Sequence, residues 1–519
     1  MGVLTLDAFT RQKFQGATRY YQPGQKINGR FKAFLLDANP LIYSSAMKAF
    51  EYGDYDTTIR QNDELTYEQK IQLVFQYTWD EIFQLVQVVD CEEVFIAFDG
   101  VAPAAKCYQQ RRRRYPRPAV SKNDFDATLI SAGTEFMNDL CLFISYKLQK
   151  EWIKDAVKKV IFSGHTVAGE GEHKNLSYIR SLPQNSQVIM FGPDGDLIML
   201  GLLSNQDFYL FKVDHNTRSG YDKRYYTIRM KSIKPQIAKW SPGVHPIDAT
   251  KAFVFLGSFL GNDFLPRLEI FEVFISGIDD LFKRYLDMKK QLIRQGRLDK
   301  NVFTDLLYLL ARQEPQLLEQ RTKHPFPLLE KHLVNRKLNF DNFRKEYYSS
   351  WLKAENEKEI AQICYGYLDT LWWTWIYYNK GCPQFSHYYK HLYPPFAVDL
   401  AHYSKQWKIP FFKKDNARPA FHQLVAILPR SRMNLLPLEY HHLFQGEDFP
   451  EPDSIHINTE GKGEFEYIYE IPFYTKPITV VDKEHYNRNE IGQDRVFSKS
   501  DTEYWVITKW GEFSTKIQG

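Results

Sequence analysis

Short apolar runs that end at acidic residues recur through the first half of the chain. Three such runs cover residues 31–36, 93–98 and 188–191, and they lead into Asp37, Asp99 and the pair Asp194 and Asp196. A fourth run, at 159–163, leads through a short loop to Glu170 and Glu172. Continuous apolar runs of this length are typical of strands buried on both faces of a parallel sheet.

Helical periodicity separates these runs. Apolar residues recur at helical spacing over residues 66–89 and 134–148, which predicts crossover helices between the strands. Parallel strands joined by helices lie in one sheet with their carboxyl ends at the same edge. We therefore expect the acids that follow the four strands to meet at that edge.

The acidic residues predict a divalent metal site. An Asp-x-Asp pair alone is more often a turn device, but the recurrence of acids after four strand-like runs favours a cluster. Carboxylates that repel one another persist together when divalent cations lie between them. Glu170 and Glu172 in GEGEHK reach one site if the segment is extended, or they begin a helix whose dipole favours acids. His173 is expected to be a hydrogen-bond partner, because hard cations prefer oxygen ligands.

A basic helix is predicted directly after Asp99. Residues 103–117 read PAAKCYQQRRRRYPR, with Pro103 in the first turn. Four polar residues recur at one-turn and two-turn intervals and share a face, namely Lys106, Gln110, Arg113 and Arg114. Such a run is often only a solvated surface, but beside an acid cluster that binds metal its forked donors suit a phosphate.

The remaining chain divides near residue 290. Residues 1–30 are expected to be irregular, and a strand at 207–212 precedes a polar loop to about Pro246 and a helix at 247–260. Asp263 follows in a turn, where a single Asp usually terminates a helix. Helical, charge-rich segments, an aromatic block at 364–393 and strand-like runs such as FHQLVAIL and EYIYEIPFY come next. We predict two domains, 1–290 and 291–519.

Composition excludes some classes of protein. The 519 residues suggest about two to four structural units. Lys and Arg number 67 against 63 acids, so binding of nucleic acid must rest on local clusters. The five scattered cysteines form no CxxC motif, and no run is long and apolar enough for a signal peptide or membrane span. The sequence therefore predicts a protein that works inside the cell, without a membrane partner; it does not indicate any protein partner.

Several stretches resemble the 5′→3′ exoribonucleases of the Xrn type, in that family's order and over most of residues 31–475. They are FDGVAPAAKCYQQRRRR, GTEFMNDL, SGHTVAGEGEHK, DGDLIMLGL, FLGNDFLPRLEIFEVFISGIDDL, LWWTWIYYNKGCPQFSHYYKHLYPPFAVDL and FHQLVAILPRSRMNLLP. The resemblance implies an α/β fold with a parallel sheet of the PIN or flap-nuclease type flanked by helices. A mostly helical, aromatic-rich second region with some strands would follow and wall off the active site.

The resemblance also assigns roles by position. It implies that two Mg²⁺ or Mn²⁺ ions are held by Asp37, Asp99, Glu170, Glu172, Asp194, Asp196 and Asp263. It implies a pocket for a 5′-terminal phosphate made by Lys106, Gln110, Arg113 and Arg114. Tyr43 stands where the family has a His that stacks on the first base, and Trp373 matches a Trp that helps to close the active site.

The departures from the family pattern indicate a compact and divergent member, and our hypothesis is a viral one. Val3 is followed by LTLDAFTRQ instead of the usual opening, and Phe385 and His387 replace two tryptophans. Phe465 stands near the place of another Trp. A cellular member would work in the cytoplasm or nucleus, and a viral one in the host cell or virion.

Three functions follow from these patterns. The first is a metal-dependent 5′→3′ exoribonuclease that degrades single-stranded RNA with a 5′ monophosphate and releases mononucleotides. The second is a structure-specific 5′ flap DNA nuclease, although the Gly-rich helix-hairpin-helix expected after Asp263 is absent from FLPRLEIFEVFISGID. The third is an inactive RNA-binding scaffold, which would have no reason to retain seven mutually repelling carboxylates.

Overall fold

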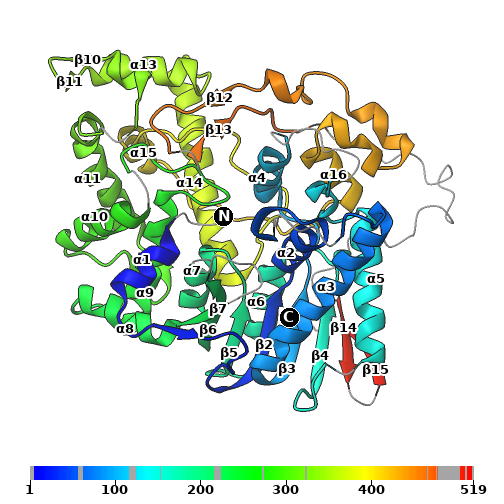
Figure 1. Cartoon of the computed structure of the whole chain (residues 1–519). Coiled ribbons are helices and arrows are strands. Elements are labelled where there is room, and N and C mark those ends of the chain that lie inside the picture. The colour runs from blue at the N-terminus through cyan, green and yellow to red at the C-terminus, as the bar shows by residue number, and fades with distance from the viewer. Residues whose placement is uncertain are drawn as a thin grey trace.

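A mixed sheet of nine strands is the main sheet of the computed structural model and lies in the lower half of the view in Figure 1. The structure describes residues 5–55, 62–115, 124–151, 153–214, 224–271, 274–321, 324–463, 466–474, 476, 478, 503–508 and 511–516. In spatial order the strands are β1 (Thr18–Tyr21), β7 (Arg224–Arg229), β6 (Asp207–Asp214), β5 (Gln187–Phe191), β2 (Arg30–Asp37), β3 (Asp90–Ala97), β4 (Lys159–Ser163), β14 (Glu503–Thr508) and β15 (Gly511–Lys516). The five from β6 to β4 are parallel, which confirms the predicted parallel sheet.

Helices cover both faces of the sheet. One face packs against α2 (Asn39–Phe50), α3 (Tyr67–Val88) and α5 (Glu135–Lys150). The other packs against α6 (Gly171–Ser181), α7 (Asp196–Leu203), α8 (Met230–Trp240) and α9 (Pro246–Gly257). Along β3, Val94 and Ile96 enter the first core while Phe95 and Ala97 enter the second, as the alternation of strand side chains requires.

The second half of the chain is mostly helical and shares a core with the sheet. Its helices are α10 (Phe274–Asp287), α11 (Lys300–Glu319), α12 (Pro327–Glu330), α13 (Phe340–Ser350), α14 (Glu357–Lys380), α15 (Ala397–Ser404) and α16 (Ala420–Ile427). The ring of Phe255 on α9 packs edge-on against Phe303 and Trp375, at centroid distances of 5.7 and 5.5 Å. The apolar core therefore continues across residue 290, and the domain boundary stays a prediction.

The described residues also form three two-stranded ribbons. They are β8 (Ile293–Arg294) with β9 (Arg297–Leu298), β10 (Leu333–Val334) with β11 (Lys337–Leu338), and β12 (Ile457–Asn458) with β13 (Ile468–Tyr469). Within the described ranges, no helix is long and apolar enough to cross a lipid bilayer.

Two segments expected to be irregular are ordered. Residues 1–30 contain α1 (Leu6–Lys13), whose Leu6 and Phe9 enter the core, and the edge strand β1. The expected loop before Pro246 contains β7 and α8, and on α8 only Met230, Ile233 and Ile237 are buried. The edge strand β1 and the helix α8, with its narrow apolar stripe, each have few apolar residues. The sequence pattern therefore did not predict them.

The run FHQLVAIL was wrongly predicted as a strand. It forms α16, which packs on α4 (Ala104–Arg114) and is buried almost all round, including Phe421, Leu424 and Val425. A helix that is apolar on every side gives the same continuous run as a buried strand. Of EYIYEIPFY, only Ile468–Tyr469 is a strand.

Candidate active site

Carboxylates gather at the carboxyl edge of the parallel strands. Asp37 ends β2, Asp99 follows β3, and the Asp99 Oδ1 atom accepts a hydrogen bond of 2.7 Å from the Gly171 backbone N–H. A Cβ atom at Gly171 would lie 2.7 Å from Asp37 Oδ1, so only glycine permits this close approach. The strand ends and the start of α6 therefore meet as the sequence predicts.

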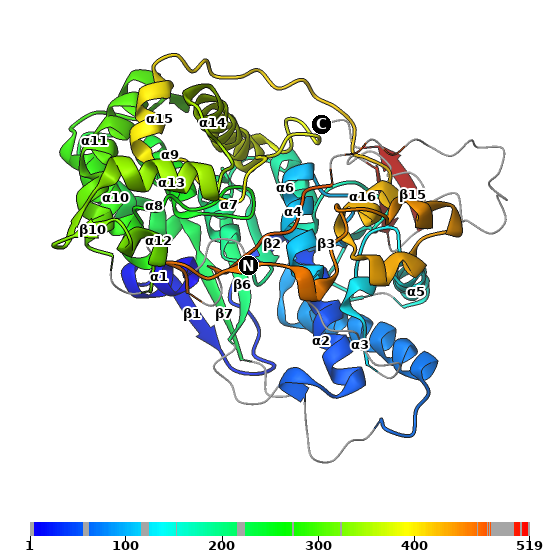
Figure 2. The same cartoon turned by 90° about the horizontal axis from the view of Figure 1, so that it is seen from above.

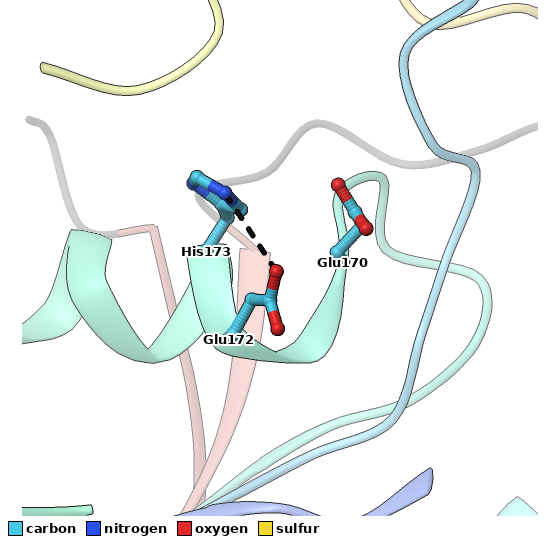
Figure 3. A group of neighbouring side chains, drawn as sticks. All are labelled: Glu170, Glu172 and His173. Carbon is cyan, nitrogen blue, oxygen red and sulfur yellow. Dashed lines mark ion pairs between the residues drawn. The ribbon is translucent and has the colours of Figure 1, made fainter. Parts of the chain in front are cut away.

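Glu170 and Glu172 lie at the start of α6 (Figure 3). Glu170 precedes the helix with extended backbone angles, and Glu172 is in the first turn. Of the two alternatives for this segment, the start of a helix is therefore correct, and the fully extended segment is wrong. Both side chains are almost fully buried, and carboxylate oxygens of Glu172, Asp194 and Asp196 all lie within 4.8 Å of one another.

Asp263 joins the cluster through a lysine. The Lys106 ammonium lies 2.6 Å from both Glu170 Oε2 and Asp263 Oδ2, and Gln109 donates a further hydrogen bond to Asp263. Burial opposes the charge on Lys106, but Asp263 and Glu170 hold its pKa well above the ordinary value. Burial also opposes ionisation of Asp263, and Lys106 outweighs it and lowers the pKa of that carboxyl. This pair is therefore charged.

Three buried carboxyls, those of Asp37, Glu172 and Asp196, resist ionisation. Burial, followed by repulsion from Asp99 and Asp194, raises the pKa of Asp37 well above its ordinary value. Burial, followed by repulsion from Asp196, also raises the pKa of Glu172 well above its ordinary value. Burial and repulsion from Asp194 raise the pKa of Asp196 to about 7. Several acids in one buried place therefore require positive charge beyond that of Lys106 at neutral pH.

The cluster has the chemistry of a site for hard divalent cations. Asp37 Oδ1 and Asp196 Oδ1 are buried and have no hydrogen-bond partner among the described residues. Buried polar atoms ordinarily have partners, and cations such as Mg²⁺ and Mn²⁺ take carboxylate oxygens as ligands. The residues present therefore fit such an ion, with Glu172, Asp194 and Asp196 forming its most compact group of oxygens.

His173 does not make the hydrogen bonds expected of it. Neither ring nitrogen has a hydrogen-bond partner in the described part of the chain, and the ring instead stacks on Tyr377 at 3.7 Å between centroids. Its Nε2 atom lies 3.9 Å from Glu172 Oε1, the contact dashed in Figure 3. Burial lowers the pKa of His173 well below its ordinary value, so the ring is neutral and this contact is not an ion pair at neutral pH.

A cavity of about 290 Å³ joins the acid cluster to the basic face of α4. Its lining includes Tyr43, Asp37, Asp99, Glu170, Glu172, Asp194, Lys106, Gln110, Arg113 and Arg114. Arg114 is held by Ser131, at 2.8 Å from Nη2 to Oγ. Arg113 also lines the cavity, and its buried Nη2 atom has no acceptor among the described residues. The structure thus brings the basic face and the carboxylates together.

The two aromatic residues singled out from the sequence occupy different places. Tyr43 is half-buried on α2 and lines the cavity. Trp373 is fully buried on α14, donates to the Gln384 carbonyl at 2.9 Å and stacks on Tyr377 at 4.8 Å. Trp373 therefore lies behind Tyr377 and does not border the cavity. Phe465 lies outside the described residues.

Three residues that contact the carboxylates were not singled out from the sequence. Asn39 Nδ2 donates to Asp99 Oδ2 at 2.9 Å, Gln109 donates to Asp263, and the Tyr377 hydroxyl donates to Glu170 Oε1 at 2.8 Å. Asn39 stands two residues after Asp37 at the start of a helix, which is a usable signal. Tyr377 is far in sequence from the carboxylates, so no local pattern points to its role.

Comparisons with known proteins identify a family and several relatives of similar sequence. The model for the N-terminus of the XRN 5′-3′ exonuclease matches residues 1–120 and 116–213, and that for the Xrn1 helical domain matches residues 330–477. The chain is 24% identical to human 5′-3′ exoribonuclease 1 over 93% of its length and 23% identical to the Saccharomyces cerevisiae protein of that name over 90%. It is also 23% identical to 5′-3′ exoribonuclease 2 of Gibberella zeae over 87%.

The chain spans only part of these relatives. The matches cover 34% of the human protein, 43% of the Saccharomyces cerevisiae protein and 70% of the Gibberella zeae protein. Similarity therefore extends along nearly the whole present chain, whereas much of each of the first two relatives has no counterpart in it.

Proposed function

Because the chain belongs to the XRN 5′-3′ exonuclease family, we propose that it is a metal-dependent 5′→3′ exoribonuclease acting on single-stranded RNA with a 5′ monophosphate. The observation that carries the proposal is that the same cavity is lined by carboxylates and by Gln110, Arg113 and Arg114. A terminal phosphate would contact the basic residues while the next phosphodiester bond lies at the carboxylates.

The carboxylates would hold the metal. The residues that fit this role are Asp37, Asp99, Glu170, Glu172, Asp194, Asp196 and Asp263. A pair of bound Mg²⁺ or Mn²⁺ ions supplies a hydroxide nucleophile and stabilises the leaving oxygen. Lys106, between Glu170 and Asp263, would position two of these carboxylates.

The basic face would select the RNA end. Arg113 has a buried donor without a partner, and an arginine beside a cavity matches phosphate oxygens. Arg114 is fixed by Ser131 and by the Gln110 carbonyl at 3.1 Å, so it would contribute charge in a fixed place. A 5′ hydroxyl would leave these buried cations without an anion, which is unfavourable.

The cavity also limits what can enter. Its volume of about 290 Å³ leaves room for a terminal nucleotide. Tyr43 lines the cavity and would stack on the leading base. A cap or triphosphate adds bulk beyond the monophosphate, and a duplex end would have to unwind before its terminal phosphate reached Arg113.

End selection tests the proposal. Initial rates are measured on four RNAs of one sequence that carry a monophosphate, triphosphate, cap or hydroxyl at the 5′ end. We expect rapid release of mononucleotides from the monophosphate RNA alone, and Arg113→Ala should lose most of that preference. Arg112→Ala is the matched control, because Arg112 is on the same helix but lines a different cavity. Equal wild-type rates on the four RNAs, or full monophosphate preference in Arg113→Ala, would refute the proposal.

A further inference from the structure

The connection between α15 and α16 carries a strongly exposed aromatic ring. Phe411 is 95% exposed, the largest fraction among the large apolar side chains of the described residues. Single exposed apolar residues are common on protein surfaces and alone mean little. The surroundings of Phe411 distinguish it. Figure 2 shows this connection as a long segment running along the outside of the molecule.

The segment is fixed on both sides of Phe411. Before it, Trp407 is buried and its indole N–H donates to Asp369 at 2.7 Å. After it, the ring of Phe412 packs edge-on against His387 at 5.0 Å, and Asp415 accepts hydrogen bonds from two backbone N–H groups, one of them from Ser386 at 3.1 Å. The neighbouring anchors therefore hold the Phe411 ring outside the core.

The outer side of the segment is cationic. Lys408, Lys413 and Lys414 are exposed, and within the described part of the chain none of them forms an ion pair. The acid of the segment, Asp415, directs its carboxylate inward to backbone donors. A bare aromatic face among lysines has the composition of a surface that binds single-stranded nucleic acid, where bases stack and phosphates meet cations.

The segment lies one layer outside the candidate active site. The Phe385 carbonyl accepts a hydrogen bond of 2.7 Å from the backbone N–H of Ala104, the first residue of α4. Phe385 in turn donates its backbone N–H to Asp415. Lys106, in the acid cluster, is two residues beyond Ala104. Two hydrogen bonds thus connect the exposed segment to the helix that carries the predicted phosphate contacts.

We propose that Phe411, together with Lys408, Lys413 and Lys414, forms an outer platform that binds the single-stranded RNA still to be degraded. The inference rests on the proposed function, because it assigns a second contact to the same RNA. The ring would stack on a base several nucleotides behind the 5′ end, and the lysines would contact the flanking phosphates. An RNA that ends before the platform would not use it.

Binding as a function of RNA length tests the platform. The affinities of two 5′-monophosphate RNAs, about four and about twenty nucleotides long, are measured in EDTA so that a metal-dependent nuclease cannot cleave them. Phe411→Ala should weaken binding of the long RNA about five-fold or more and leave the short RNA unchanged. Phe411→Trp should retain wild-type affinity. Leu438→Ala, at another strongly exposed apolar position, is the control and should have no effect.

The lysines give a second readout. For single-stranded RNA, each lysine–phosphate contact contributes about 0.7 to the slope of log affinity against log salt concentration. A double variant with Lys413→Ala and Lys414→Ala should therefore lower that slope by about 1.4 for the long RNA. An unchanged affinity of Phe411→Ala for the long RNA, or an equal loss on both RNAs, overturns the platform. A loss restricted to the long RNA supports it even if no degradation is found, and in that case only the proposed nuclease activity fails.

Discussion

The Tyr377 hydroxyl donates a hydrogen bond of 2.8 Å to Glu170 Oε1 and so links the helical second half of the chain to the acid cluster. The Tyr377 ring stacks on His173 on α6 and on Trp373 on α14, with centroid distances of 3.7 and 4.8 Å. A buried aromatic stack with few free rotamers therefore fixes the donor that orients this carboxylate.

Removal of this hydroxyl should weaken metal binding. Tyr377→Phe keeps the ring and removes one hydrogen bond to a buried carboxylate, an interaction of about 1.5–3 kcal/mol for a charged acceptor. We expect the Mg²⁺ concentration for half-maximal activity to rise about ten-fold, with activity largely restored at saturating Mg²⁺. A Mg²⁺ titration of the cleavage rate measures this.

The next residue provides a matched control. Tyr378 is equally buried on α14, but its hydroxyl has no hydrogen-bond partner among the described residues. Tyr378→Phe should therefore shift the Mg²⁺ requirement less than Tyr377→Phe does, because Tyr378 acts on Asp196 and Asp263 only through space. The positioning role of Tyr377 would be disproved by identical Mg²⁺ titrations of Tyr377→Phe and the wild type, or by equal shifts in both variants.

Asp196→Asn should abolish turnover yet stabilise the metal-free protein. Burial and the Asp194 carboxylate raise the pKa of Asp196 from an ordinary 3.8 to about 7, so the folded state binds a proton that the unfolded state has released between these values. The stability of the wild type therefore falls as the pH rises through this window. Asparagine cannot ionise, so the variant should avoid that fall.

Thermal or urea unfolding in EDTA measures this effect. The advantage of Asp196→Asn in free energy of unfolding should grow by about 2 kcal/mol between pH 4 and pH 8, since one pKa unit corresponds to about 1.4 kcal/mol and coupling within the cluster reduces the sum. A constant advantage across that range would show that Asp196 does not titrate there. An active Asp196→Asn protein would remove this carboxylate from the proposed chemistry.

Tyr43→Ala should slow degradation without unfolding the protein. Tyr43 is only half-buried, and base stacking on an aromatic ring contributes about 1–3 kcal/mol. We expect the rate per nucleotide to fall about ten-fold while the melting temperature changes little, and Tyr43→Phe should retain most of the rate. Wild-type rates in Tyr43→Ala would show that the ring only lines the cavity.

The sequence predicts the carboxylates of the candidate site more completely than the residues that hold them in place. Asp37, Asp99 and the Asp194 pair follow buried strands, and because parallel strands end at one edge their meeting could be inferred from local pattern. Asp263 lies in a turn, and only the family resemblance identified it. Its approach to the cluster depends on how Lys106 and α4 pack, which no local pattern encodes.

The missed features depend on long-range packing. Tyr377 reaches Glu170 across more than two hundred residues of sequence, so nothing near either residue signals the contact. Trp373 was expected near the acid cluster; it is buried in the core, where it stacks on Tyr377, the residue of the same run that contacts Glu170. The α16 segment was taken for a strand because a helix buried on all sides has no polar face.

The central claim is that the carboxylate cluster and the basic face act together on a 5′-monophosphate end. The most direct measurement is the size of the products released from a 5′-monophosphate single-stranded RNA labelled at its 5′ end, in Mg²⁺ and in EDTA. The account predicts labelled mononucleotide as the first product in Mg²⁺ and intact RNA in EDTA. Undiminished cleavage in EDTA, or longer labelled fragments without mononucleotide in Mg²⁺, would contradict it.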